Sequence, residues 1–151
     1  MELIFNKNNN ETNYKFVEGD LVLSSASCGD ISLDGIISSL IDEELNNIKI
    51  FDLSMENEDL TNEEILKEFA ENFEWIHEFK NDLINKKIDK ILYIYSIENN
   101  SDIKGLGTQL FQEISKNYDC VMLIPLSEVI DFWENLGFED LGNNHMVLLK
   151  K

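Results

Sequence analysis

Two glycines, Gly105 and Gly107, separate a strongly apolar segment from an amphipathic one, and this junction constrains the fold more than any other feature. Residues 90–97 (KILYIYSI) are rich in aromatic and β-branched side chains, which is typical of a buried strand. Apolar residues then recur at helical spacing over residues 105–116. The apolar side of this predicted helix consists of Leu106, Leu110, Phe111 and Ile114. A buried strand that leads directly into a helix indicates an α/β protein.

The same junction is suited to binding an anion through the main chain. The first N–H groups of a helix have no partner within the helix and lie at the positive end of its dipole. Glycines let a phosphate approach this backbone closely. A simple tight turn between a strand and a helix has the same glycine pattern, so both interpretations stay open on these residues alone.

The rest of the C-terminal part continues the alternation of strands and helices. The predicted segments are a strand at 120–125, a short helix at 127–136, and a closing hairpin of 138–141 with His145–Leu149. Ser127 is expected to cap the short helix, and Gly137 is expected to end it. The order strand, helix, strand, helix and two strands predicts a sheet of mixed strand direction.

The N-terminal part has a less regular pattern. The predicted segments are a strand at 3–5, a hairpin of 14–18 with 21–26 across Gly19-Asp20, a helix at 33–45, an alternating strand at 48–55 and a long helix at 61–85. Thr61 followed by Glu64 is a capping box that opens the long helix. With 151 residues, we expect one domain, divided into an N-terminal half at 1–89 and a second half at 90–151.

Charge is the strongest compositional signal. The chain has 30 acidic residues and 12 basic ones, all of them lysines, for a net charge of −18. This balance argues against direct binding to a nucleic-acid backbone or to an anionic membrane surface. It fits either an ordinary self-repelling surface or attraction of a cationic partner.

The location of the protein is predicted from what its sequence lacks. No apolar run is long enough to span a bilayer, and the N-terminus does not have a signal-peptide pattern, so a cytoplasmic location is expected. Cys120 falls in an apolar run and is expected to be buried, whereas Cys28 lies in a polar segment, where an exposed position stays open. Neither His77 nor His145 is assigned a role, and each is expected at a surface or boundary position.

Two segments of the C-terminal part resemble motifs of the GCN5-related N-acetyltransferase superfamily. Residues 102–111 (DIKGLGTQLF) are similar to its pyrophosphate loop, and residues 129–138 (VIDFWENLGF) are similar to its late helix and turn. The resemblance covers about residues 90–149. It implies an α/β fold with a mixed, mostly antiparallel central sheet flanked by helices. It also implies acetyl-CoA as cofactor and direct attack by an amine acceptor.

By position, the resemblance also assigns candidate site residues. Main-chain groups of 96–98 would pair with the pantetheine arm, and residues 102–108 would surround the pyrophosphate. A splayed opening between strands 92–97 and 120–125 would admit the thioester. The implied cofactor-binding residues are Ser96, Ile97, Glu98, Asp102, Ile103, Lys104, Gly105, Leu106, Gly107, Thr108 and Trp133.

Three residues differ from the pattern of the family. Asp102 stands where Arg or Gln is usual, and Trp133 stands where a Tyr often protonates the leaving thiolate. Leu126 occupies a position where many members have Asn. Glu98 and Trp133 are the candidate catalytic residues, and Asp52 on the predicted strand 48–55 is a further candidate base.

Three functions remain open on the sequence. The first is an acetyl-CoA-dependent N-acetyltransferase with a cationic amine substrate, either a small molecule or a lysine-bearing protein. The second is a weakly active or inactive domain of this fold that binds CoA or another protein. The third, supported by charge alone, is an acidic mimic of nucleic acid. A homodimer through the closing hairpin is implied by resemblance.

Overall fold

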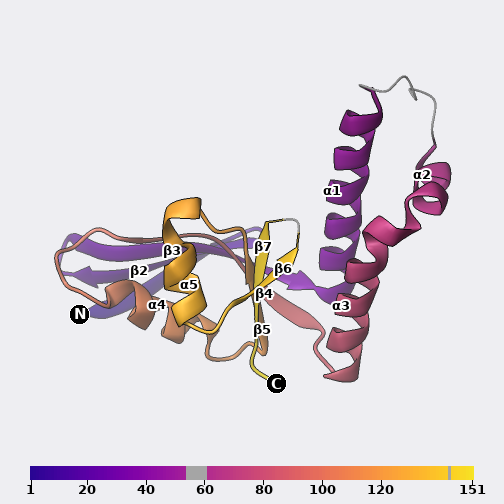
Figure 1. Cartoon of the computed structure of the whole chain (residues 1–151). Helices are drawn as coiled ribbons and strands as arrows, with labels where there is room; N and C mark the ends of the chain where they lie inside the picture. Colours follow the sequence, from indigo (N-terminus) through magenta and orange to yellow (C-terminus); the bar gives the residue numbers. More distant parts are fainter. Residues whose placement is uncertain (54–60, 143) are drawn as a thin grey trace. The chain divides into compact units, whose positions relative to one another are not determined.

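The computed structural model describes residues 1–53, 61–142 and 144–151 (Figure 1). The chain forms two compact units, one made of residues 1–31 and 90–151, and the other of residues 32–89. Each unit is described by itself below. The first three strands thus join the C-terminal part of the chain in one unit. A single domain of 151 residues stays a prediction.

A sheet of seven strands forms the first unit, in the order β1-β2-β3-β4-β5-β7-β6. Strands β4 and β5 are parallel, whereas the β1–β2, β2–β3, β5–β7 and β6–β7 pairs are antiparallel. This confirms the predicted mixed and mostly antiparallel sheet. The strands are β1 (Glu2–Asn8), β2 (Glu11–Glu18), β3 (Leu21–Ser32), β4 (Lys90–Asn99), β5 (Cys120–Leu123), β6 (Glu139–Gly142) and β7 (His145–Leu149).

Both predicted hairpins are present. Gly19 has φ of 62°, a conformation that glycine adopts without strain, and it joins β2 to β3 in the predicted turn. Strands β6 and β7 form the predicted closing hairpin. β4 is buried only in part, because its side chains are exposed at Tyr95 and Ser96, whereas burial was predicted for all of 90–97.

Two helices of the first unit follow the glycine junction and β5. They are α4 (Leu106–Ser115) and α5 (Ile130–Asn135), and α5 is preceded by a 3-10 helix at Ser127–Val129. Ser127 does not cap this segment, because Leu126 is the capping residue and contributes no side-chain hydrogen bond. Gly137, with φ of 101°, follows α5 and ends it as predicted. Leu106, Leu110, Phe111 and Ile114 of α4 all join the apolar core of the sheet, as the helical pattern predicted.

The second unit begins with α1 (Leu33–Leu53), and here one prediction is wrong. The helix continues through residues 48–53, which were predicted as a strand; Ser54 and Met55 lie outside the described residues. Leu45 and Ile48 are both buried at helical spacing, so burial on one side of the helix overrides the local alternation. Asp52 therefore lies in α1 and not on a strand.

The predicted helix at 61–85 consists of three pieces. They are α2 (Asn62–Glu68), a 3-10 helix (Ala70–Phe73) and α3 (Glu74–Asn85). The Glu64 N–H donates to Thr61 Oγ1 at 3.3 Å, which confirms the predicted cap, and α3 ends at Asn85 as predicted. The interruption leaves Ile65 and Phe73 both buried, so packing rather than helix propensity sets the local geometry. Among the described residues, no helix is long and apolar enough to cross a membrane.

Both cysteines are buried. Cys120 is inaccessible as predicted, and Cys28 is only 1% exposed, so it does not take the exposed position that its polar segment left open. Cys28 belongs to β3 and packs with the core of the sheet. Its polar neighbours in the sequence gave no indication of this packing. Burial, and then the nearby Glu11 carboxylate, raise the pKa of the Cys28 thiol to about 12. His145 is also buried, at 2% exposure, and not at the surface or a boundary as expected.

We expect the folded protein to react very slowly with a thiol reagent at pH 8. The thiolate is the reactive form, and a pKa of about 12 leaves almost no Cys28 thiolate at that pH. Adding 5,5′-dithiobis(2-nitrobenzoate) before and after unfolding in guanidinium measures this difference. Rapid reaction of one thiol in the folded protein would contradict the burial of these cysteines.

Candidate functional site

The pairing between the parallel strands β4 and β5 ends halfway along β4. Their paired residues end with Ile94 and Leu123, and β5 stops there, while β4 continues to Asn99. Beyond Ile94, the main chain of β4 therefore has no β5 partner on that side. This is the opening that the sequence predicted between the two strands.

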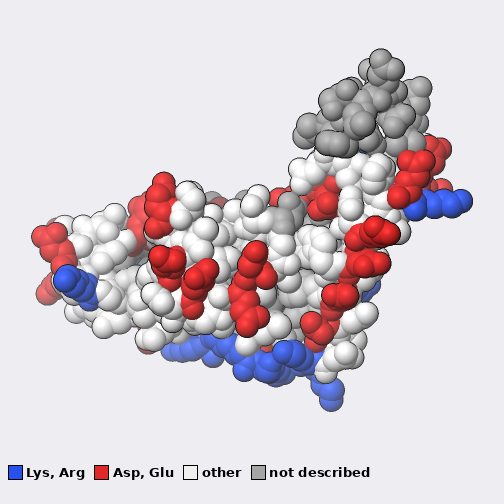
Figure 2. Space-filling model, in the orientation of Figure 1, with Lys and Arg blue, Asp and Glu red and all other residues white. Residues whose placement is uncertain are grey.

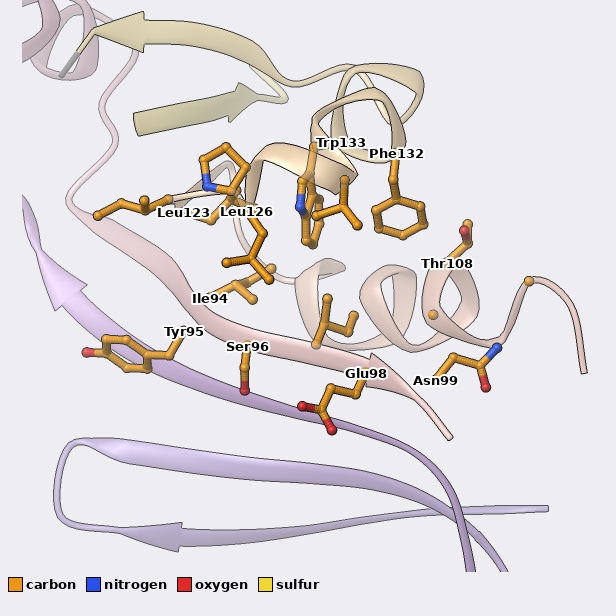
Figure 3. Close-up of a pocket in the computed structure, with 16 residues that line it drawn as sticks. Ile94, Tyr95, Ser96, Glu98, Asn99, Thr108, Leu123, Leu126, Phe132 and Trp133 are labelled. Atoms are coloured by element: carbon orange, nitrogen blue, oxygen red, sulfur yellow. The ribbon is translucent and has the colours of Figure 1, made fainter. Parts of the chain in front are cut away.

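A cavity of about 610 Å³ lies at this opening (Figure 3). Residues 94–99 of β4 line one side, and residues 123–126, which end β5 and follow it, line another. Gly105, Gly107 and Thr108 contribute the start of α4, while the α5 region adds apolar side chains. The volume is in the range of pockets that bind small molecules and cofactors.

The start of α4 presents unpaired N–H groups to this cavity. Gly105 is the capping residue, with φ of 84°, and no side chain caps the helix. The first hydrogen bond of the helix runs from Gln109 N–H to the Gly105 carbonyl at 3.0 Å. The N–H groups of Leu106, Gly107 and Thr108 therefore precede any acceptor within the helix. Together with the helix dipole, these groups are suited to bind an anion through the main chain.

The two glycines of the junction have different roles. Gly105 adopts a left-handed conformation that other residues reach only with strain. At Gly107, an added Cβ would meet only Phe132 Cζ, at an ordinary distance of 3.8 Å. The fold therefore has room for an alanine at position 107.

A small hydrogen-bond network fixes the loop between β4 and α4. The Asn99 side chain donates to the Ile103 carbonyl at 2.8 Å and accepts from the Ser101 N–H at 3.1 Å. Ser101 Oγ donates to Asn99 Oδ1 at 2.8 Å and accepts from the Ile103 N–H at 3.2 Å. The Ile103 N–H is thus used inside the loop. Asn99 and Ser101 were not predicted as site residues, although Asn and Ser before a helix are typical of such loops.

The structure brings together most, but not all, of the predicted cofactor residues. Those that line the cavity are Ser96, Ile97, Glu98, Gly105, Gly107, Thr108 and Trp133. Asp102, Ile103 and Lys104 are exposed and are not among the lining residues. The Leu106 side chain is buried in the core, so Leu106 can contribute only its main-chain N–H group to a site at the start of α4. Leu126, which replaces the usual Asn, is 71% exposed at the cavity.

Trp133 is a packing residue of the cavity wall. It is 4% exposed and makes edge-to-face contacts with Phe132, Phe138 and Phe111, at centroid distances of 4.9, 5.3 and 6.0 Å. The indole N–H donates hydrogen bonds but does not serve as an acid. In this place Trp133 shapes the cavity and stabilises α5 against α4, and it has no chemistry to replace a tyrosine.

The cavity has an apolar side and a polar side. Phe132 and Trp133 lie on the side of the two helices, whereas the side chains of Tyr95, Ser96 and Glu98 extend away from them in Figure 3. Glu98 is exposed and lines the cavity. The opening between the strands thus joins an apolar chamber to a surface with a hydroxyl, a phenol ring and a carboxylate.

No family model matches the sequence, and no curated protein matches it. Solved structures do match the fold. They include the Bacillus subtilis N-acetyltransferase YlbP in complex with coenzyme A, at 12% identity and a TM-score of 0.48. An agmatine N-acetyltransferase in its apo form matches at 7% identity and a TM-score of 0.50. A Drosophila melanogaster polyamine N-acetyltransferase matches at 7% identity and a TM-score of 0.48.

Coverage is broad for this chain and narrower for the others. Each match covers 91% of this chain, but only 66% of YlbP, 73% of the agmatine enzyme and 74% of the polyamine enzyme. These three structures are N-acetyltransferases. The chain therefore has the fold of the GCN5-related N-acetyltransferases, as the two sequence motifs predicted.

Proposed function

We propose that the protein is an acetyl-CoA-dependent N-acetyltransferase in which an amine acceptor attacks the thioester directly. One observation carries this proposal. The parallel strands β4 and β5 part after Ile94 and Leu123, and the cavity at the opening is bordered by the uncapped start of α4. The resemblance of the loop and the fold of the chain support the same activity.

The residues present at the cavity fit an acyl-CoA. The N–H groups at the start of α4 would hold the pyrophosphate, without any side-chain cap to displace. The main chain of residues 96–98, which has no β5 partner, would pair with the amides of the pantetheine arm. The apolar wall formed by Phe132 and Trp133 would exclude water from the arm. Lys104 is the nearest cation in sequence to this loop.

The chemistry asks little of the protein. Bound acetyl-CoA supplies a thioester carbonyl, and transfer forms one C–N bond while one C–S bond breaks. Main-chain N–H groups of 96–98 on the side without a β5 partner would stabilise negative charge on the carbonyl oxygen. Glu98 is the carboxylate that borders the cavity, and we assign it the proton that the amine loses. Since Trp133 cannot act as an acid, the leaving thiolate takes its proton from solvent.

We propose a cationic amine as the acceptor because Glu98 lines the cavity and further carboxylates are exposed in and after the α5 segment. From Cys120 to Leu149 the chain contains no lysine, but exposes five carboxylates around and after α5, namely Glu128, Asp131, Glu134, Glu139 and Asp140. Figure 2 shows acidic side chains spread over the face in view, with most lysines along its lower border. Carboxylates attract an ammonium ion but raise its pKa, so deprotonation must occur locally, at Glu98.

A domain that binds CoA without turnover is the second candidate. Trp133 in place of an acidic tyrosine and Asp102 in the loop favour it. Both candidate functions require binding of the cofactor. They differ only in whether the acetyl group is transferred to an amine. Measuring thiol release from acetyl-CoA with agmatine, spermidine and lysine peptides separates them.

We expect CoA and acetyl-CoA to stabilise the folded protein. A ligand at 100 times its dissociation constant adds about 2.7 kcal/mol to the free energy of unfolding. Differential scanning calorimetry measures the change in Tm as the cofactor concentration is raised from zero to the millimolar range. The matched control is adenosine, which lacks the pyrophosphate and the pantetheine arm and is expected to cause no shift. Absence of any shift with millimolar CoA would rule out both candidates.

A further inference from the structure

Gly29 occupies a place where its backbone does not require a glycine. It lies inside β3, the neighbour of β4 in the sheet, and has no positive φ. Glycine in the interior of a strand is destabilising and commonly marks a close approach by another group. The approaching group is Tyr95 of β4: a Cβ at position 29 would lie 2.7 Å from Tyr95 Oη and 3.0 Å from its Cε2. Gly29 therefore provides the space in which the phenol end of Tyr95 rests.

Tyr95 is held beside the cavity from two directions. Gly29 supports its phenol end, and the ring of Tyr93 packs against it at a centroid distance of 5.3 Å. The Tyr93 ring in turn meets the buried His145 edge-on, at 6.2 Å. Tyr95 nevertheless is 55% exposed and lines the cavity. A large aromatic side chain that is positioned this firmly and still open to solvent suggests a ligand contact.

The polar side of the cavity also contains Glu98, three residues further along β4. In Figure 3, the hydroxyl of Tyr95 points away from Ser96 and Glu98, so the ring lies nearer to these two side chains than the hydroxyl does. An aromatic ring and a carboxylate both attract an ammonium ion, the ring through its quadrupole and the carboxylate through its charge. Neither group suits the phosphates of a cofactor.

We propose that the Tyr95 ring and the Glu98 carboxylate form the subsite for the cationic amine acceptor, and that Gly29 is the positioning residue that seats the ring. This inference rests on the proposed function, and it adds where the acceptor binds and what determines its selection. The cofactor approaches from the start of α4, whereas the acceptor binds on the other side of the opening, where Tyr95, Ser96 and Glu98 extend away from the two helices.

The substitution Gly29→Ala tests whether Gly29 positions the Tyr95 ring. The three atoms nearest to the new methyl group all belong to the far end of the Tyr95 side chain, which would have to shift, and alanine fits a strand conformation. We therefore expect an unchanged fold with a displaced ring. Ser25→Ala is the matched control, because Ser25 lies in the same strand, pairs with Lys15 of β2 and does not line the cavity.

The experiment is calorimetric titration of spermidine and of agmatine into the protein saturated with CoA. Loss of a cation–π contact at an exposed ring corresponds to a rise of about two- to fivefold in Kd, which we expect for both Tyr95→Leu and Gly29→Ala. Tyr95→Phe keeps the ring and should bind like the wild type, as should Ser25→Ala. The double variant Gly29→Ala/Tyr95→Leu should bind no more weakly than Tyr95→Leu alone. The Kd for CoA should be the same in all variants.

Each outcome supports or overturns a separate part of the inference. If the wild type binds an amine in this way but releases no thiol from acetyl-CoA, the proposed function fails and the subsite stands. If Tyr95→Leu leaves amine binding unchanged, or the wild type with CoA binds neither amine, the subsite is overturned. If the effects of the two substitutions multiply in the double variant, Gly29 does not act through Tyr95. Equal weakening of CoA and amine binding would also overturn the inference, because it indicates general disruption.

Discussion

Replacement of Trp133 by alanine is expected to lower the free energy of unfolding by about 3–5 kcal/mol, the range for deleting a large buried aromatic. Trp133 is 4% exposed and touches three other aromatic rings, one from α4, one from α5 and one just before β6. Its loss would leave a cavity where these elements meet. Urea unfolding followed by circular dichroism measures the change. A loss of a large part of the stability is expected, since small domains are stable by only about 5–15 kcal/mol.

Trp75→Ala is the matched control for this prediction. Trp75 lies in α3 and is only partly buried, so the same substitution there should cost distinctly less. Trp133→Phe keeps an aromatic ring in the cluster and should lie between the wild type and Trp133→Ala. Equal losses for Trp75→Ala and Trp133→Ala would contradict the assignment of Trp133 as the packing centre of this region.

Replacement of Asp102 by arginine is expected to tighten CoA binding about tenfold at moderate salt. Two unit charges a few ångströms apart interact by roughly 1–4 kcal/mol, depending on screening, and tenfold corresponds to about 1.4 kcal/mol. Asp102 is exposed between Ser101 and Ile103, in the loop that precedes the uncapped helix. Its charge opposes a pyrophosphate there, and arginine would attract one. Calorimetric titration of CoA at low and high salt measures the effect.

Glu113→Arg makes the same change in net charge at the other end of α4. Glu113 lies in the last turns of the helix, where a cation suits the helix dipole, and its pair with Lys116 is exposed. This control should leave the Kd for CoA nearly unchanged. The advantage of Asp102→Arg should also shrink as salt rises. A gain that is equal in both variants, or that is independent of salt, would show that the loop does not hold the pyrophosphate.

The order of elements in the C-terminal part was predictable because its signals are local. An apolar strand, two glycines and an amphipathic stripe specify β4, the junction and α4 without help from distant residues. Gly137 ended α5 as predicted for the same reason. The strand predicted at 48–55 was wrong because Ile48 lies three residues after Leu45, at helical spacing, and both are buried on the same helix.

The candidate site was predictable only in its main-chain part. Gly105 and Gly107 indicated an anion site, and the structure adds that no side chain caps it. The surface or boundary position expected for His145 was wrong, and the burial of Cys28 was not predicted, because burial depends on which strands become neighbours, and a sequence window does not contain that information. Asn99 and Ser101 were missed since their effect is a hydrogen-bond network between residues of one short loop.

The sequence by itself determined the glycine junction and the charge of the protein, because both depend on residues that are adjacent or simply counted. Only the tertiary structure decided that β4 continues beyond the end of β5 and that a cavity lies where the pairing of the two strands ends. It also decided that Gly29 and Tyr95, distant in sequence, meet across neighbouring strands. The physical reason is that pairing of strands and close approach of side chains are non-local contacts, fixed by the register of the whole sheet and not by any one segment.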